Sequence, residues 1–146
     1  MPIHWSLLPD SQLCIVTGSG TVTGADIASY VAGTIREGAK GYAKLVDMTD
    51  CSLALDHDDL EGVARDLIQY GWGERPGPVA IIVRTALNLD MAVLVKQRVG
   101  DRPFRIFTSL TAARSWLESY VESYRLYADD SLPTDDGQRP RPLRPS

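Results

Sequence analysis

The carboxylates between positions 47 and 59 are the residues most suited to chemistry in this sequence. Asp47 stands near the exit of the apolar run Ala43–Met48, and ligands of open α/β sheets bind beyond the carboxyl ends of strands. A phosphoacceptor aspartate there would also need an acidic pair to hold Mg²⁺ and a lysine near the phosphoryl oxygens. The corresponding positions hold Gly18-Ser19-Gly20 and Thr108-Ser109. We therefore expect Asp47 to cap nearby loop amides instead.

The other titratable residues form no recognisable metal site or catalytic group. The acidic run at positions 56–59 lacks the alternating ligands, the glycine and the distal glutamate of a calcium loop, and helix capping explains it. No Gly-x-Ser-x-Gly nucleophile elbow occurs. An enzyme that uses Asp47 would need a titratable neighbour, for which the sequence offers His57 or Asp50. The sequence thus predicts a non-enzymatic protein without metal or cofactor.

Two segments have the composition of an anion or phosphate site. The stretch Gly18–Gly24 is expected to form a loop between a strand and a helix, where Gly18, Ser19 and Gly20 would offer backbone amides to an anion. Its spacing matches neither the dinucleotide fingerprint nor the Walker loop. Thr49 and Ser52 supply hydroxyls near the start of the next helix. A phosphate on either would bring nearly two negative charges beside an acidic helix start, and repulsion would remodel that loop.

Hydrophobic periodicity predicts the strands and helices that position these segments. Strands are expected over Ile3–Leu8, Leu13–Val16, Ala43–Met48, Val79–Val83 and Arg105–Phe107. Helices are expected after the caps Thr23, Asp56 and Ser109, and around Leu87–Val95. The order predicts an α/β fold with a mainly parallel five-stranded sheet, an antiparallel N-terminal strand and about four helices distributed over both sides.

Several of these segments carry a family resemblance that covers roughly residues 3 to 124. They are Val22–Asp26, Lys44–Met48, Val79–Val83, and Arg105–Phe107 followed by Ala113–Leu117. In this order they resemble the STAS fold, most closely its SpoIIAA-like branch, whose members are described as similar to the lipid-binding Sec14 family. Anti-sigma-factor antagonists of this fold carry an Asp-Ser-Ser-Gly-like segment with a phosphorylated serine. The corresponding segment here begins at Asp47 and lacks the Ser-Gly pair.

The resemblance implies a non-enzymatic regulatory or binding module that acts through a protein partner or a small apolar or anionic ligand. Phosphorylation at Thr49 or Ser52 would be its switch. The alternative is a lipid-binding or hydrophobic-ligand-binding protein with a cavity between the sheet and a mobile helix. That alternative predicts an apolar cavity beneath the third helix, lined by Leu87, Met91, Leu94 and Val95.

The last helix presents a row of tyrosines at helical spacing. Tyr120, Tyr124 and Tyr127 project from one side of that helix. Because interfaces are rich in tyrosine, this row predicts a homodimer contact, although it could equally cover the domain's own edge strand.

Composition limits the remaining possibilities. With 146 residues, 44% hydrophobic and 23% charged, the chain suits one soluble domain, which we place at 1–126, followed by a flexible Pro/Arg/Asp-rich tail at 127–146. A net charge of −4 and a pI of about 5.1 disfavour nucleic acid as a partner. No apolar run is long enough for an integral membrane span. Cys14 and Cys51 are expected to be free thiols, and with no secretory leader the predicted location is cytoplasmic.

Overall fold

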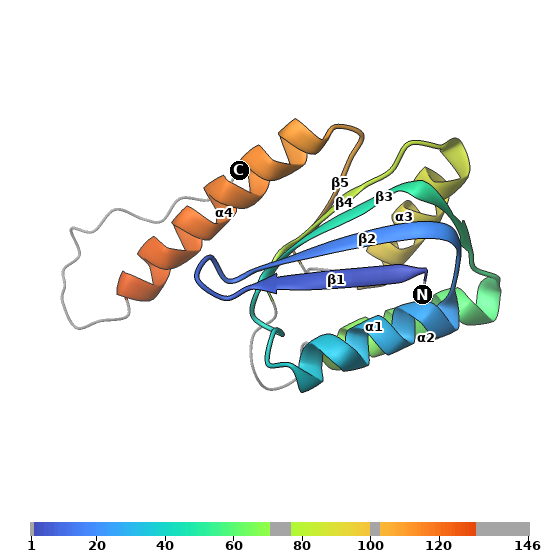
Figure 1. Ribbon diagram of the computed structural model, residues 1–146, viewed down its shortest axis with the longest axis horizontal. Helices are drawn as coiled ribbons and strands as arrows, with labels where there is room; N and C mark the ends of the chain where they lie inside the picture. The colour runs from blue at the N-terminus through green and yellow to red at the C-terminus, as the bar shows by residue number, and fades with distance from the viewer. Residues whose placement is uncertain (1, 71–76, 100–102, 131–146) are drawn as a thin grey trace.

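The computed structural model describes residues 2–70, 77–99 and 103–130, which form five strands and four helices (Figure 1). In chain order the elements are β1 (Ile3–Leu8), β2 (Leu13–Thr23), α1 (Gly24–Arg36), β3 (Ala43–Ala54), α2 (His57–Tyr70), β4 (Val79–Ile82), α3 (Ala86–Val99), β5 (Phe104–Phe107) and α4 (Leu110–Asp130). The predicted alternation of strands and helices is confirmed.

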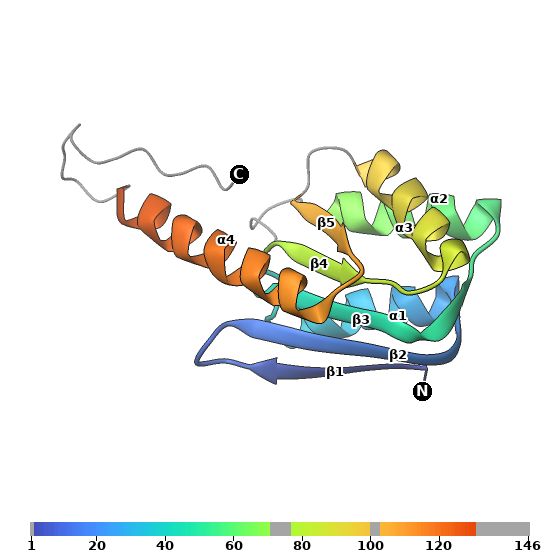
Figure 2. The same ribbon diagram turned by 90° about the horizontal axis from the view of Figure 1, so that it is seen from above.

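The five strands lie side by side in chain order. β1 is antiparallel to β2, and every other neighbouring pair is parallel. One helix connects the two strands of each parallel pair, and the chain crosses the sheet in the same direction each time. Right-handed crossovers therefore place α1, α2 and α3 on one face of the sheet. α4 follows the last strand and packs on the opposite face (Figures 1 and 2). The predicted α/β fold, with a mainly parallel sheet and helices on both sides, is confirmed.

Two hydrophobic cores follow from the alternation of side chains along the strands. The larger core lies beneath α1, α2 and α3 and includes Val46 and Ile81. The smaller one lies beneath α4, where Leu45 and Ile82 point the other way and pack with Ala113. Both faces of the central strands are thus covered, which explains their nearly continuous apolar sequences.

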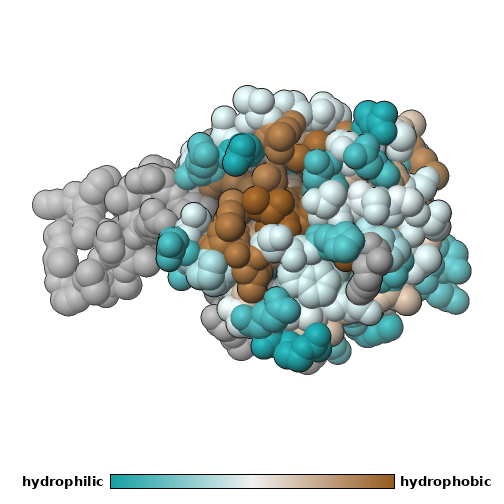
Figure 3. Space-filling model, in the orientation of Figure 1, coloured by the Kyte–Doolittle hydropathy of each residue, from teal (hydrophilic) through white to brown (hydrophobic). Residues whose placement is uncertain are grey.

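α4 packs mainly over β3, β4 and β5. The same face of β1 and β2 therefore retains apolar surface beside α4 (Figure 3). Leu8 is 42% exposed there, while Leu13 and Ile15 are half-buried. Within the described ranges, no helix is long and apolar enough to cross a membrane.

Two predicted helix starts have the expected cap geometry. Thr23 Oγ1 accepts a hydrogen bond from Asp26 N at 3.3 Å, and Asp26 Oδ2 accepts one from Thr23 N at 2.9 Å. Asp56 and Asp59 make the same reciprocal pair at the start of α2, at 2.8 and 3.1 Å. These capping boxes satisfy amides that the first turn of a helix leaves without partners.

The predicted loop at 18–24 is wrong. β2 continues through Gly18–Gly20 to Thr23 and pairs with the second half of β3, after a register shift between Thr17 and Ser19. Gly20 has a φ of +66°, a conformation that glycine adopts without strain. At the other end of the chain α4 continues to Asp130, past the predicted boundary at 126, and residues 131–146 lie outside the described part. The division into domain and tail stays a prediction.

Candidate functional site

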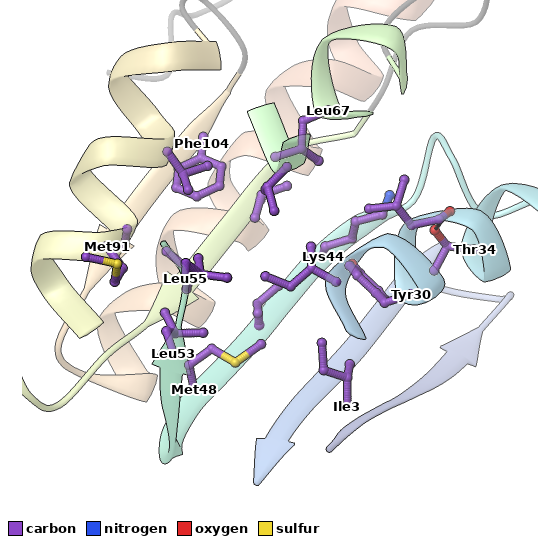
Figure 4. Close-up of a pocket in the computed structure, with 18 residues that line it drawn as sticks. Ile3, Tyr30, Thr34, Lys44, Met48, Leu53, Leu55, Leu67, Met91 and Phe104 are labelled. Atoms are coloured by element: carbon purple, nitrogen blue, oxygen red, sulfur yellow. Dashed lines mark hydrogen bonds between the residues drawn. The ribbon is translucent and has the colours of Figure 1, made fainter. Parts of the chain in front are cut away.

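An apolar cavity of about 100 Å³ lies between the sheet and the helices α1, α2 and α3 (Figure 4). The sheet contributes one side of it, mainly through β3 and β4, and the three helices contribute the others. Its lining residues are Ile3, Ile27, Tyr30, Val31, Thr34, Lys44, Val46, Met48, Leu53, Leu55, Val63, Leu67, Val79, Ile81, Met91, Ala92, Val95 and Phe104. Nearly all of them are hydrocarbon or thioether side chains, so the cavity suits an apolar occupant.

The volume of the cavity limits what it could hold. An engineered apolar cavity of about 150 Å³ binds benzene, whereas pockets for drug-sized ligands measure about 300–1,000 Å³. A volume of about 100 Å³ therefore corresponds to one small ring or a short alkyl group.

Lys44 is the charged residue at this cavity, and its side chain is buried, with 2% exposure. Its Nζ donates hydrogen bonds to the carbonyl oxygens of Ala39 at 3.0 Å, Lys40 at 3.0 Å and Tyr42 at 2.8 Å. These carbonyls follow the C-terminus of α1, where the helix dipole favours a cation. The sequence interpretation did not single out Lys44, although a lysine inside an apolar strand, soon after two glycines, was a usable signal.

The structure brings two of the four predicted cavity residues to the cavity. Met91 and Val95 line it, one helical turn apart on α3. Leu94 is half-buried against the larger core, and Leu87, in the first turn of α3, is 53% exposed. The cavity is also not confined to the space beneath α3, where it was predicted, because α1 and α2 supply much of its lining.

Asp47 caps a nearby amide, as expected, but it does so within β3, because that strand continues to Ala54 and the predicted strand end at Met48 is wrong. Its Oδ1 accepts hydrogen bonds from Thr49 N at 3.0 Å and from Thr49 Oγ1 at 2.6 Å. Arg84 reaches the same part of β3 and donates to Thr49 O from Nε at 3.2 Å and from Nη2 at 2.6 Å. Arg84 Nη2 also lies 3.9 Å from Asp50 Oδ1, and both side chains are largely exposed. Ser52 is exposed on the same segment of β3.

Asn88, on α3, holds this part of β3 from inside the protein. Its side chain is 1% exposed and has three backbone partners. Oδ1 accepts from Leu53 N at 2.9 Å, and Nδ2 donates to Cys51 O at 2.8 Å and to Met48 O at 3.3 Å. These backbone groups lie past the point where β4 ends, so Asn88 takes the place of a neighbouring strand. Sequence reasoning missed this role, because it depends on how α3 packs against β3.

Gly18, Ser19 and Gly20 are part of β2, so they do not form the loop in which an anion cradle was predicted. Ser19 N donates to Pro2 O at 2.8 Å. Gly18 lies against β3 so closely that an added Cβ would come within 2.5 Å of Met48 Sδ. Close packing of two strands therefore accounts for this glycine.

The two cysteines are buried and unreactive in character. Burial raises the pKa of Cys14 to about 11, and burial together with the charges of Asp47 and Asp50 raises the pKa of Cys51 to about 11. Both thiols therefore stay protonated near neutral pH and are poor nucleophiles. In the part of the chain that the structure describes, no three His, Cys, Asp or Glu side chains are placed to hold a metal ion.

The tyrosine row of the last helix is described only in part. Tyr120 is half-buried, and its ring centroid lies 5.4 Å from that of Trp116. Arg105 in turn places its guanidinium carbon 6.0 Å from the Trp116 ring centroid. Tyr124 and Tyr127 belong to α4, but their side chains lie outside the described residues. The homodimer contact stays a prediction.

Comparison with known proteins identifies the fold. No protein-family model matches the sequence, and no curated protein matches it. Among solved structures, an uncharacterized DUF3478-family protein with a SpoIIAA-like fold from Shewanella loihica PV-4 is similar, with a TM-score of 0.51 and 20% identity over 79% of this chain and 91% of that one. An anti-sigma factor antagonist from Mycobacterium paratuberculosis is similar too, with a TM-score of 0.54 and 15% identity over 80% of this chain and 94% of that one. The protein thus has the SpoIIAA-like, or STAS, fold that its sequence resembles.

Proposed function

We propose that this protein is a non-enzymatic module that binds a small apolar ligand between its sheet and the helices α1, α2 and α3. The cavity is the observation that carries the proposal. Protein interiors are close-packed, and each cubic ångström of void costs about 24 cal/mol. A void of about 100 Å³ would cost up to about 2 kcal/mol of stability if it were enclosed and empty. A ligand that fills it would recover part of this free energy.

Native mass spectrometry tests this proposal on protein purified from its own host. The native mass is expected to exceed the denatured mass by that of a small molecule that leaves on denaturation. Ala92→Leu, which places a larger side chain at the cavity, should lose the added mass. Ala113→Leu is the matched control, because Ala113 is also a buried helical alanine but belongs to α4, in the core on the other face of the sheet. An added mass that persists in Ala92→Leu would place the ligand elsewhere.

A second candidate function is regulation through a protein partner at the Asp47–Ser52 segment. The likeness to an anti-sigma factor antagonist supports a regulatory role, and the exposure of Arg84, Asp50 and Ser52 supports this segment as the contact. Ser52 is the more accessible phosphorylation site, because the hydroxyl of half-buried Thr49 already donates to Asp47. A phosphate on Ser52 would add negative charge near the acidic start of α2.

The test of this second candidate is to compare partner capture by Ser52→Glu and Ser52→Ala, with Ser29→Glu as a control on the exposed surface of α1. A switch predicts that one partner is retained by only one of the Ser52 variants and is unaffected by Ser29→Glu. A covalent phosphate that survives denaturation and maps to Ser52 or Thr49 would add direct support. Identical partners for all three variants would exclude a switch at Ser52.

A further inference from the structure

The chemical class of the ligand can be inferred from the polar groups at the cavity, and this inference rests on the proposed function. Lys44 is the charged residue among those that line the cavity. A lysine beside apolar walls would ordinarily indicate an amphipathic acid, whose carboxylate pairs with the ammonium while its hydrocarbon part fills the cavity. The hydrogen bonds of Lys44 argue against that interpretation.

An ammonium group has three N–H donors. Lys44 Nζ lies 2.8–3.0 Å from three carbonyl oxygens, those of Ala39, Lys40 and Tyr42, so its donor capacity is already used by the backbone. A carboxylate could bind Lys44 only by displacing one of these carbonyls, which would then lose its partner. The carboxylate would also approach a group of carbonyl oxygens, whose partial negative charges repel it.

The polar side chains beside Lys44 offer no better site for an anion. Thr34 is 1% exposed, and its Oγ1 donates to Val31 O at 2.9 Å within α1. Figure 4 shows Thr34 and Lys44 together near α1, with Met91 and Phe104 on the α3 side of the cavity. Thioether and aromatic side chains on that side suit an apolar guest, and methionine adapts readily to its shape.

We infer that the cavity takes an uncharged apolar ligand, of the size of one ring or a short alkyl group. Lys44 is a structural lysine that closes the α1 side of the cavity by holding the backbone carbonyls after that helix, and it does not receive an anion. Amphipathic acids such as fatty acids are therefore excluded as ligands of this cavity, although their hydrocarbon chains would match its walls.

The test compares three ligands of nearly equal shape: toluene, benzamide and benzoate. Each is titrated at neutral pH into the full chain, with the methyl resonances of Met48 and Met91 as reporters, because both residues line the cavity. Toluene is expected to produce saturable shifts, benzamide to bind more weakly, and benzoate to bind at least about tenfold more weakly than toluene, because its charge must be desolvated without a free partner. Benzoate binding as tightly as benzamide, or more tightly, would overturn the inference and leave the proposed function intact. Failure of all three ligands to bind would overturn both.

A lysine variant gives a second measurement. If Lys44 received the anion, Lys44→Met would weaken benzoate selectively and leave toluene unchanged. The inference predicts instead that Lys44→Met lowers the unfolding midpoint and does not weaken benzoate relative to toluene. Lys96→Met is the matched control, because Lys96 Nζ also donates to a backbone carbonyl, that of Phe104 at 2.7 Å, but Lys96 is exposed and does not itself line the cavity. The ligand comparison on the unmodified chain needs neither variant to fold.

Discussion

Replacing two buried helical alanines by leucine should change the stability of the protein in opposite directions. Ala92 on α3 is 2% exposed and lines the cavity, whereas Ala113 on α4 is 0% exposed and belongs to the closely packed core on the other face of the sheet. Replacing each by leucine adds the same three carbon atoms in the same type of secondary structure. Any difference in stability between the two variants therefore reports the space around each position.

The expected free energies can be estimated from the structure. At position 92, three added carbons at about 0.8 kcal/mol each would contribute about 2.4 kcal/mol of burial. Ordering the leucine side chain costs about 0.5–1 kcal/mol, so Ala92→Leu should gain about 1.5 kcal/mol. Ala113 is 0% exposed and does not line the cavity, so the added carbons would have to displace core neighbours, and overpacking a core costs about 1–3 kcal/mol. The two variants should thus differ by about 2.5–4.5 kcal/mol in the free energy of unfolding.

Urea denaturation of the full chain, followed by far-UV circular dichroism, measures this difference. Ala92→Leu should raise the midpoint and Ala113→Leu should lower it, with little change in the slope of either transition. If Ala92→Leu is destabilised as much as Ala113→Leu, the space beside Ala92 is not open in solution. That result would refute the cavity and, with it, the ligand-binding proposal.

Three further predictions concern groups whose partners are identified by the structure. Asn88→Ala should lower the free energy of unfolding by about 3 kcal/mol or more in urea denaturation, because three buried backbone groups lose their partner at about 1–3 kcal/mol each. Gln97→Ala, at an exposed position of the same helix, is the control and should change stability little. Equal effects of the two substitutions would contradict the role of Asn88. Thr23→Ala should cost about 1 kcal/mol in the same assay, since it removes the side chain of the capping box, and no loss would show that the cap contributes nothing. Burial raises the pKa of the Cys14 and Cys51 thiols to about 11 in the folded protein, so both should react with a disulfide reagent far more slowly in the native chain than in the unfolded one. As pH rises from 9 to about 11 the unfolded thiols lose their protons first, so the free energy of unfolding should fall, and a double cysteine-to-alanine variant should show a smaller decline.

The fold could be predicted because its signals are local. The cap at Thr23 and the reciprocal aspartates at the start of α2 are recognisable within four consecutive residues, and the apolar runs mark the central strands. The extension of β2 through Gly18–Gly20 has no such local signal, because glycine and serine give no periodicity. Those residues become a strand only because the second half of β3 lies beside them.

The candidate site was predictable only in outline for the same reason. A cavity between sheet and helices was anticipated, and Met91 and Val95 do line it. Which other residues reach it depends on the packing of three helices against one another, which helical periodicity does not determine. Lys44 illustrates this limit. In the sequence it interrupts an apolar strand, and only the structure explains its burial, because the carbonyls that follow α1 surround its ammonium group.

The two candidate sites are not structurally independent, because both are built on β3 and α3. Met48 and Leu53 line the cavity, and the segment between them carries the hydroxyl of Ser52. Asn88 binds the backbone of that segment, while Met91, one turn further along α3, lines the cavity. A change in the cavity or in the segment that carries Ser52 therefore acts on both β3 and α3. Ser52→Glu should accordingly be measured in the toluene titration as well as in partner capture, since an effect on one site alone would show that β3 transmits nothing to the other.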